Sequence, residues 1–243
     1  MSLPFDSLID LLSSGLFESL YMTIVSTIIA YIIGIPLGII VFVTDTGGIL
    51  KNKPVNFIFG VIINMIRSVP FLILLVAMLP VTRAIVGTTI GSTATIVPLV
   101  AAAAPFVARM VESSLKEVSP GVIEAAKAMG ASPIQIIMRV LLPEAKPSLT
   151  VGFTIAISTI LGYSAMAGFV GGGGLGAIAI NYGYYRYKTD IMLITVALLI
   201  IIVQVFQTVG MMIAKRLISV QIIRLYDEEL QYMPMATHNI NNI

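Results

Sequence analysis

The chain contains no cysteine, a single histidine and little charge. Without cysteine it forms no disulfides, thiolate metal sites or cysteine nucleophiles. Lysine, arginine, aspartate and glutamate make up 11% of its residues, whereas soluble domains carry about a quarter. Hydrophobic residues make up 58%, and the mean hydropathy is +1.01. This composition excludes an ordinary soluble domain and indicates an integral membrane protein.

Ionisable groups are also scarce inside the long apolar stretches, where Arg67 is the single charged residue. Ion-driven carriers usually need intramembrane carboxylates or histidines, and intramembrane hydrolases need a nucleophile with a base. The lone histidine, His238, is near the chain end and is expected to be solvated. No GxxxxGK[ST] phosphate-binding loop occurs, and the net charge of +2 says little about nucleic acid. We therefore predict no catalytic residue, no metal site, no nucleic-acid partner and no cofactor bound by this chain.

Five stretches are long and apolar enough to cross a bilayer, which takes about 20 residues each. They are residues 20–43, 55–79, 84–108, 149–170 and 191–214, and the second is interrupted by Arg67 and Pro70. The sequence thus predicts an all-helical membrane protein with five spans. We expect residues 1–14 to form an interfacial segment, residues 15–214 the transmembrane domain and residues 215–243 a cytoplasmic tail.

The positions of lysine and arginine predict the orientation, because positive residues concentrate in cytoplasmic loops. Of the fourteen, most fall on one side of the predicted spans. Those on this side are Lys51, Lys53, Arg109, Lys116, Lys127, Arg139, Lys146, Lys215, Arg216 and Arg224. The amino terminus has no lysine or arginine in its first 50 residues, and it lacks the positive start of a signal peptide. We expect the amino terminus outside, and the loop 109–147 and the carboxyl terminus in the cytoplasm.

Two short helices are predicted within the loop 109–147. Ser119, followed by proline, is typical of a helix start, and Gly130 is typical of a helix end. Ser132, with Gln135 three residues later, predicts a capping box at the start of the second helix. The second helix is expected to stop before Pro143.

The same loop carries a motif: EAA, three residues, glycine, nine residues, an aliphatic residue, any residue and Leu-Pro. The motif residues are Glu124, Ala125, Ala126, Gly130, Val140, Leu142 and Pro143. This pattern resembles the signature loop of permease subunits of bacterial ATP-binding-cassette importers. The resemblance implies the type I importer fold, in which the first short helix is a coupling helix that seats on a separate ATP-hydrolysing subunit. A loop that merely rests on the bilayer is the alternative, because Val122 and Met129 extend an apolar stripe along that helix.

Two features inside the spans are candidates for the translocation path. A charge is costly within a membrane, so Arg67 is a functional candidate, although it could instead reach the cytoplasmic headgroups or a helix terminus. Tyr163, Ser164 and Met166 combine hydroxyls and a soft thioether among small neighbours. We predict that these three line or gate the path, with ordinary close packing as the alternative.

Segments outside the loop resemble the methionine importer permeases: residues 67–74 (RSVPFLIL), 105–112 (PFVARMVE) and 162–168 (GYSAMAG). The match covers roughly residues 15–214. It implies a permease homodimer in the bacterial inner membrane, two ATPase subunits that use ATP and Mg, and a substrate-binding lipoprotein. The expected function is the methionine path of an ATP-driven importer, without enzymatic activity of its own. The alternatives are import of another amino acid or small peptide, and an ATP-independent channel or carrier.

Overall fold

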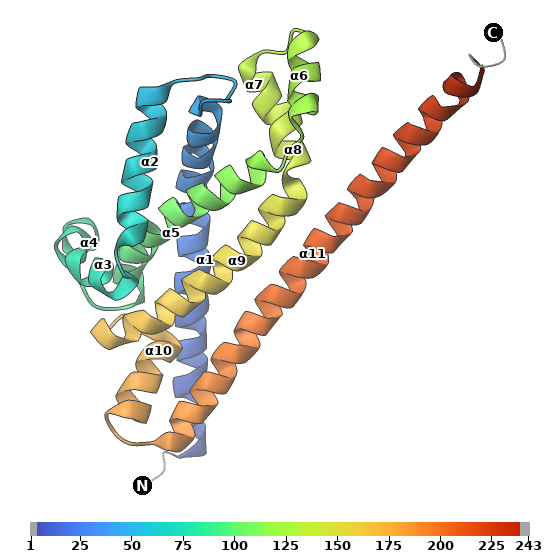
Figure 1. Ribbon diagram of the computed structural model, residues 1–243. Helices are drawn as coiled ribbons and strands as arrows, with labels where there is room; N and C mark the ends of the chain where they lie inside the picture. Colours follow the sequence, from blue (N-terminus) through green and yellow to red (C-terminus); the bar gives the residue numbers. More distant parts are fainter. Residues whose placement is uncertain (1–3, 239–243) are drawn as a thin grey trace.

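The computed structural model describes residues 4–238, and all regular structure among them is helical (Figure 1). The α-helices are α1 (Phe5–Thr44), α2 (Lys53–Ser68), α3 (Phe71–Ala77), α4 (Leu79–Val86), α5 (Ser92–Lys116), α6 (Pro120–Ala128), α7 (Pro133–Ile136), α8 (Leu142–Glu144), α9 (Lys146–Met166), α10 (Gly174–Ile178) and α11 (Thr189–His238). Three other helical segments join them: the π-helical η1 (Ile137–Leu141), the 3-10 helix η2 (Ala167–Val170) and the π-helical η3 (Ala179–Tyr184). The prediction of an all-helical membrane fold is confirmed.

Four helical stretches in the described part are long and apolar enough to cross a membrane, and the bent pair α2 and α3 makes a possible fifth. These two helices meet at 101°, because Pro70 cannot continue α2 and restricts the residue before it. The break falls where the sequence predicts it. The third predicted span starts later than expected, at Ser92 instead of residue 84, because Gly87 and Gly91 adopt positive φ angles of 83° and 100° and end α4 before α5 begins.

The segments before the first predicted span and after the last one continue the helices of those spans. Residues 5–14 are the first turns of α1, so no break separates them from the first span. Leu8, Leu11 and Leu12 pack against a cluster that includes Leu175 and Ile178 of α10. An interfacial location for this segment stays a prediction, and so does the cytoplasmic tail, where α11 continues as one helix to His238.

The helices α1 and α5 pack closely at two glycines of α1. A Cβ atom on Gly34 would lie 2.6 Å from Cγ1 of Val107, and one on Gly38 would lie 2.5 Å from the carbonyl oxygen of Ala108. Small residues at such crossings let two helix backbones pack closely inside a membrane. Val107 and Ala108 are accordingly buried, and α5 is central to the fold.

The arrangement separates the molecule into two ends (Figure 1). The short helices α6, α7 and α8 lie at one end, and the start of α1 lies at the other. The start of α2 and the carboxyl-terminal part of α11 lie toward the same end as α6 and α7. The helices α5 and α9, which lead into and out of the short helices, pack against each other and against α1.

Candidate functional site

The first short helix, α6, is placed by local chemistry at both ends. It begins at Pro120 with Ser119 in the N-cap position, although the Ser119 side chain makes no capping hydrogen bond. It ends at Ala128, and Gly130 adopts a left-handed φ of +77°. The amide of Ala131 donates to the carbonyl of Ala126 at 3.1 Å across that turn. The sequence prediction for this helix and its glycine stop is confirmed.

The helix α6 has a buried side and an exposed side. Ala126 is 3% exposed and packs in the core cluster with Ile136 and Leu141. Glu124 and Ala125 are exposed, and neither Glu124 nor Lys127 takes part in an ion pair among the described residues. Large apolar side chains are also left uncovered on this end of the molecule: Val122, Met129, Ile134 and Met138. The motif thus presents an apolar surface with free charges at its edge, as a protein docking surface does.

The second short helix begins as predicted and ends differently. Ser132 and Gln135 form the capping box, with the amide of Ser132 donating to Oε1 of Gln135 at 2.8 Å and the amide of Gln135 donating to the Ser132 hydroxyl at 3.4 Å. The expected stop before Pro143 is wrong. The chain widens into the π-helical segment η1, and α8 continues through Leu142 and Pro143, where proline stands within the first turn and needs no amide donor. Leu142 packs against the core, and Pro143 is exposed.

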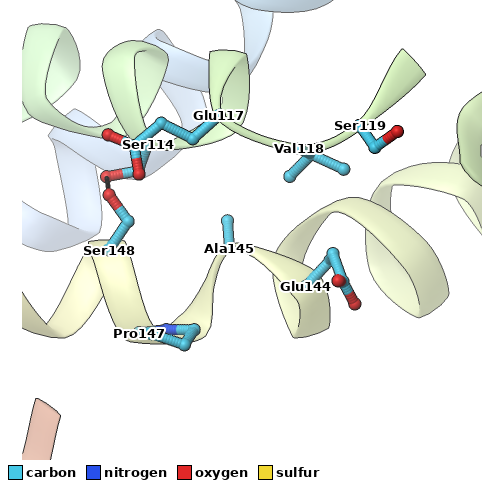
Figure 2. Close-up of a pocket in the computed structure, with 8 residues that line it drawn as sticks. All are labelled: Ser114, Glu117, Val118, Ser119, Glu144, Ala145, Pro147 and Ser148. Atoms are coloured by element: carbon cyan, nitrogen blue, oxygen red, sulfur yellow. Dashed lines mark hydrogen bonds between the residues drawn. The ribbon is translucent and has the colours of Figure 1, made fainter. Parts of the chain in front are cut away.

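A cavity of about 280 Å³ lies beneath the short helices, between the end of α5 and the turn from α8 to α9 (Figure 2). Val118 and Ala145 face each other across it, and Glu117 and Glu144 lie at its edge. At one side the Ser148 hydroxyl donates to the Ser114 hydroxyl at 3.0 Å. The two helices that flank the loop are therefore linked directly below it, so a displacement of the loop acts on both.

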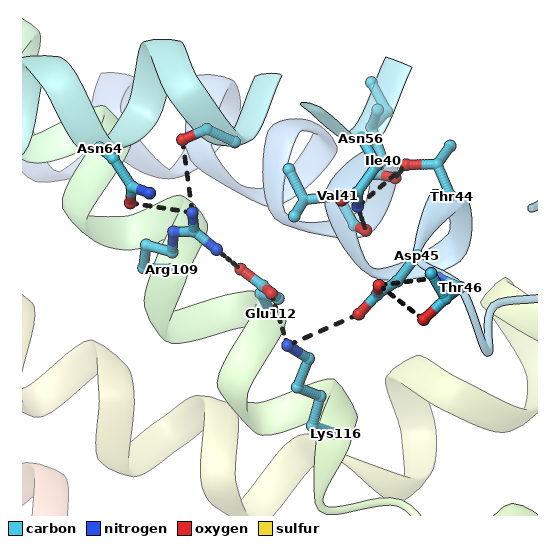
Figure 3. Close-up of polar contacts among 11 residues, drawn as sticks. Ile40, Val41, Thr44, Asp45, Thr46, Asn56, Asn64, Arg109, Glu112 and Lys116 are labelled. Atoms are coloured by element: carbon cyan, nitrogen blue, oxygen red, sulfur yellow. Dashed lines mark hydrogen bonds and ion pairs between the residues drawn. The ribbon is translucent and has the colours of Figure 1, made fainter. Parts of the chain in front are cut away.

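An ion-pair network ties α5 to α1 and α2 beside this region (Figure 3). Glu112, buried within α5, pairs with Arg109 and with Lys116, whose Nζ lies 2.7 Å from Oε1. Arg109 also donates to Oδ1 of Asn64 in α2 at 2.9 Å, and Lys116 lies 3.9 Å from a carboxylate oxygen of Asp45 after α1. Sequence reasoning missed this network. The i, i+3 and i+4 spacing of residues 109, 112 and 116 is the signal that could have found it.

We expect Glu112→Gln to destabilise the protein, because it removes the buried negative charge between two cations. A lost charged hydrogen bond costs about 1.5–3 kcal/mol, and the melting temperature of the purified protein in detergent should fall accordingly. The matched control is Glu117→Gln, which neutralises an exposed carboxylate just after the same helix. Equal melting temperatures for the two variants would contradict a structural role for the network.

A second cavity, of about 250 Å³, brings together two residues that the sequence analysis singled out separately. Arg67, in the last turn of α2, and Tyr163, in α9, both line it. The ring of Tyr163 stacks on that of Phe71 in α3, with ring centroids 4.5 Å apart and an interplanar angle of 7°. Arg67 therefore does lie at a helix terminus, where it is exposed within this chain and lines a cavity bounded by α2, α3, α5 and α9.

The other two path candidates point in different directions. Met166, the last residue of α9, is 44% exposed. Ser164 is buried, and its hydroxyl donates to the carbonyl of Leu161 in its own helix at 2.8 Å. Their predicted roles at the path remain predictions, and Met166 has the exposure that contact with a second molecule requires.

Together, the spans and the exposed motif helices at one end define a membrane permease that works with a partner protein. Residues 34–219 match the family described as binding-protein-dependent transport system inner membrane component, and the chain belongs to this family. It is thus an inner-membrane transport component and not an enzyme by itself, which confirms the prediction from the EAA motif.

Several relatives are similar over most of the chain. A probable D-methionine transport system permease protein, MetI, of Vibrio cholerae is 51% identical over 207 residues, which are 85% of this chain and 92% of that protein. The D-methionine transport system permease protein MetI of Escherichia coli K12 is 50% identical over 158 residues, 65% of this chain and 73% of that protein. A solved structure, of inward-facing conformations of the MetNI methionine ABC transporter, is 47% identical with a TM-score of 0.85 and covers 89% of this chain and 99% of that one.

More distant structures share the fold alone. An amino acid ABC transporter crystallised with histidines is 20% identical with a TM-score of 0.73, covering 89% of this chain and all of that one. The type I importer fold predicted from the sequence is confirmed by these matches.

Proposed function

We propose that this chain is the permease subunit that forms the translocation path for methionine in an ATP-driven importer. The observation that carries the proposal is the 47% identity, at a TM-score of 0.85, to a chain of a methionine ABC transporter. The relatives named as D-methionine permeases support the same substrate. The scarcity of ionisable groups in the spans agrees with an energy source outside the chain.

The proposed assembly contains two copies of this permease and two ATPase subunits that bind ATP and Mg. A substrate-binding lipoprotein delivers methionine from outside. The apolar surface around α6 and α7, made by Val122, Met129, Ile134 and Met138, is the proposed contact with the ATPase. Glu124 stands uncovered beside it and can meet a basic group of that subunit. In this arrangement Gly130, Leu142 and Pro143 hold the shape of the loop and do not themselves act on substrate.

Uptake measured in proteoliposomes tests this function. The permease is reconstituted with its ATPase subunits, and the lipoprotein charged with radiolabelled methionine is added together with internal ATP. We expect accumulation that requires ATP and that excess unlabelled methionine suppresses. Equal uptake without ATP would favour a channel or carrier. If another amino acid or a small peptide suppresses the uptake and unlabelled methionine does not, the chain imports that other substrate.

The orientation follows from the positive residues and gives a separate prediction. We expect residue 6 outside and residues 127 and 215 in the cytoplasm. The predicted external position of Ser2 lies outside the described residues, so Asp6, which is exposed, is the better probe. Because the chain has no native cysteine, Asp6→Cys, Lys127→Cys and Lys215→Cys can each be treated with an impermeant thiol reagent. In cells whose outer membrane admits the reagent, only the first should label. Labelling of position 127 before the inner membrane is opened would reverse the orientation.

A further inference from the structure

The cavity that Arg67 and Tyr163 share is lined by four helices and by the bend between two of them. Its volume is about 250 Å³, a size suited to a small ligand and below the range typical of drug-sized ones. The lining residues are Ile66 and Arg67 of α2, Val69 of the bend, Phe71 and Leu74 of α3, Ala102 and Phe106 of α5, and Tyr163 of α9. All of them except Arg67 and the Tyr163 hydroxyl are apolar, so the cavity has one charged group on an aromatic and aliphatic wall.

Arg67 has no counter-ion in the part of the chain whose side chains the structure describes. Among the described residues no hydrogen bond or ion pair engages its guanidinium, and no acidic side chain lines the cavity. Its position along α2 is 14 residues from Lys53, about 21 Å at 1.5 Å per residue. That is too far for its side chain to reach the headgroups at the end of the molecule where α2 begins. A guanidinium held at this depth favours an anionic partner, and a carboxylate fits its paired donors.

The aromatic wall suits an apolar side chain. The stacked rings of Phe71 and Tyr163 form a polarizable aromatic part of the cavity wall, and Phe106 also lines the cavity. Thioether groups make favourable contacts with aromatic rings, worth about 0.3–1.5 kcal/mol each. No carboxylate is present to hold an ammonium group, so binding should be weak. Weak binding is what a transport path needs, since the ligand must also leave.

The cavity is also joined to the motif loop. Ala102 and Phe106 belong to α5, which enters the loop, and Tyr163 belongs to α9, which leaves it. A movement of the short helices that shifts α5 against α9 therefore changes the distance between Phe106 and Tyr163 in the cavity wall. Arg67 lies on α2, which packs against α5, so the same movement also changes the distance between its guanidinium and Tyr163 of α9.

We propose that this cavity is a substrate subsite inside the permease, where Arg67 binds the carboxylate of an amino acid and the Phe71–Tyr163 wall receives its apolar side chain. The proposal rests on the proposed import of methionine. It adds a site within this chain to the one expected on an external binding protein, and it assigns Arg67 to the path in place of the membrane interface.

Protection of an introduced thiol tests the subsite. In the complete transporter without the lipoprotein, Leu74→Cys places a thiol in the cavity, while Ile73→Cys places one on the same helix outside it, where Ile73 is 62% exposed. A ligand that covers the thiol at twice its dissociation constant slows alkylation about threefold. We expect methionine to protect position 74 and not position 73. Methioninol, which lacks the carboxylate, should protect neither, and adding Arg67→Gln to Leu74→Cys should abolish protection, whereas Arg67→Lys should keep part of it.

Three outcomes would overturn the subsite. These are no protection by millimolar methionine, equal protection by methioninol, and equal protection in the Arg67→Gln background. Protection by anionic lipid instead of methionine would make the cavity a lipid site, which also contradicts the proposal. Because the proteoliposome uptake assay is independent, normal uptake with failed protection refutes the subsite alone, whereas failed uptake refutes the importer function.

Discussion

Gly130→Val should leave the permease inserted in the membrane and lower ATP-driven uptake at least about tenfold. The residue holds φ at +77°, and a left-handed conformation costs a residue with a Cβ roughly 1–2 kcal/mol, more when the side chain is branched. A Cβ at this position would meet nothing within 4 Å, so the strain arises from the backbone alone. Relief of that strain would turn α6 away from α7 and spoil the docking surface. Uptake is measured in proteoliposomes and normalised to the amount of reconstituted permease.

Two further variants separate backbone geometry from surface charge. Gly130→Asn should keep most of the uptake, because asparagine tolerates the left-handed region. Glu124→Lys should lower uptake with α6 intact, since it reverses an exposed charge on the proposed contact. Normal uptake in both Gly130→Val and Glu124→Lys would remove the coupling role of the loop.

Gly38→Ala should lower the free energy of unfolding by up to about 3 kcal/mol, the upper part of the range for overpacked sites. The added methyl group would lie 2.5 Å from the carbonyl oxygen of Ala108 and 2.7 Å from Cβ of Val111, so α1 and α5 must separate. The matched control is Gly60→Ala in α2, where the nearest atom is a guanidinium nitrogen of Arg109 at 3.8 Å. Thermal unfolding in detergent measures both. Equal stability of the two variants would contradict the close α1–α5 crossing.

Local chemistry alone predicted the start and end of α6 and the capping box of α7. The residues that decide those features are neighbours in the chain, so their spacing carries the information. The continuation of helix through Pro143 could not be predicted in this way. It depends on the π-helical turn η1, where Leu141 and the preceding Ile136 pack in the core. No residue pattern in the sequence predicts this turn.

Contacts between segments that are distant in the sequence could not be predicted either. The sequence marked Arg67 and Tyr163 as separate candidates, but their meeting in one cavity depends on the 101° bend between α2 and α3 and on the position of α9. The pairing of Lys116 with Asp45 likewise requires the turn after α1 to lie beside α5. Hydropathy placed the spans, because bilayer thickness sets their length, but it does not determine which polar side chains meet between them.

The central claim is that the loop 109–147 transmits motion of the ATPase subunits through α9 to a gate at Met166, the last residue of that helix. Cross-linking between the two copies of the permease tests this claim most directly. Met166→Cys adds the only cysteine of the chain, at an exposed position one helix away from the motif. We expect a disulfide between the copies in the nucleotide-free complex and less of it when a non-hydrolysable ATP analogue holds the ATPase subunits together. Absence of the cross-link in every state, together with unchanged uptake by Met166→Ala, would contradict the gate and place Met166 in ordinary packing.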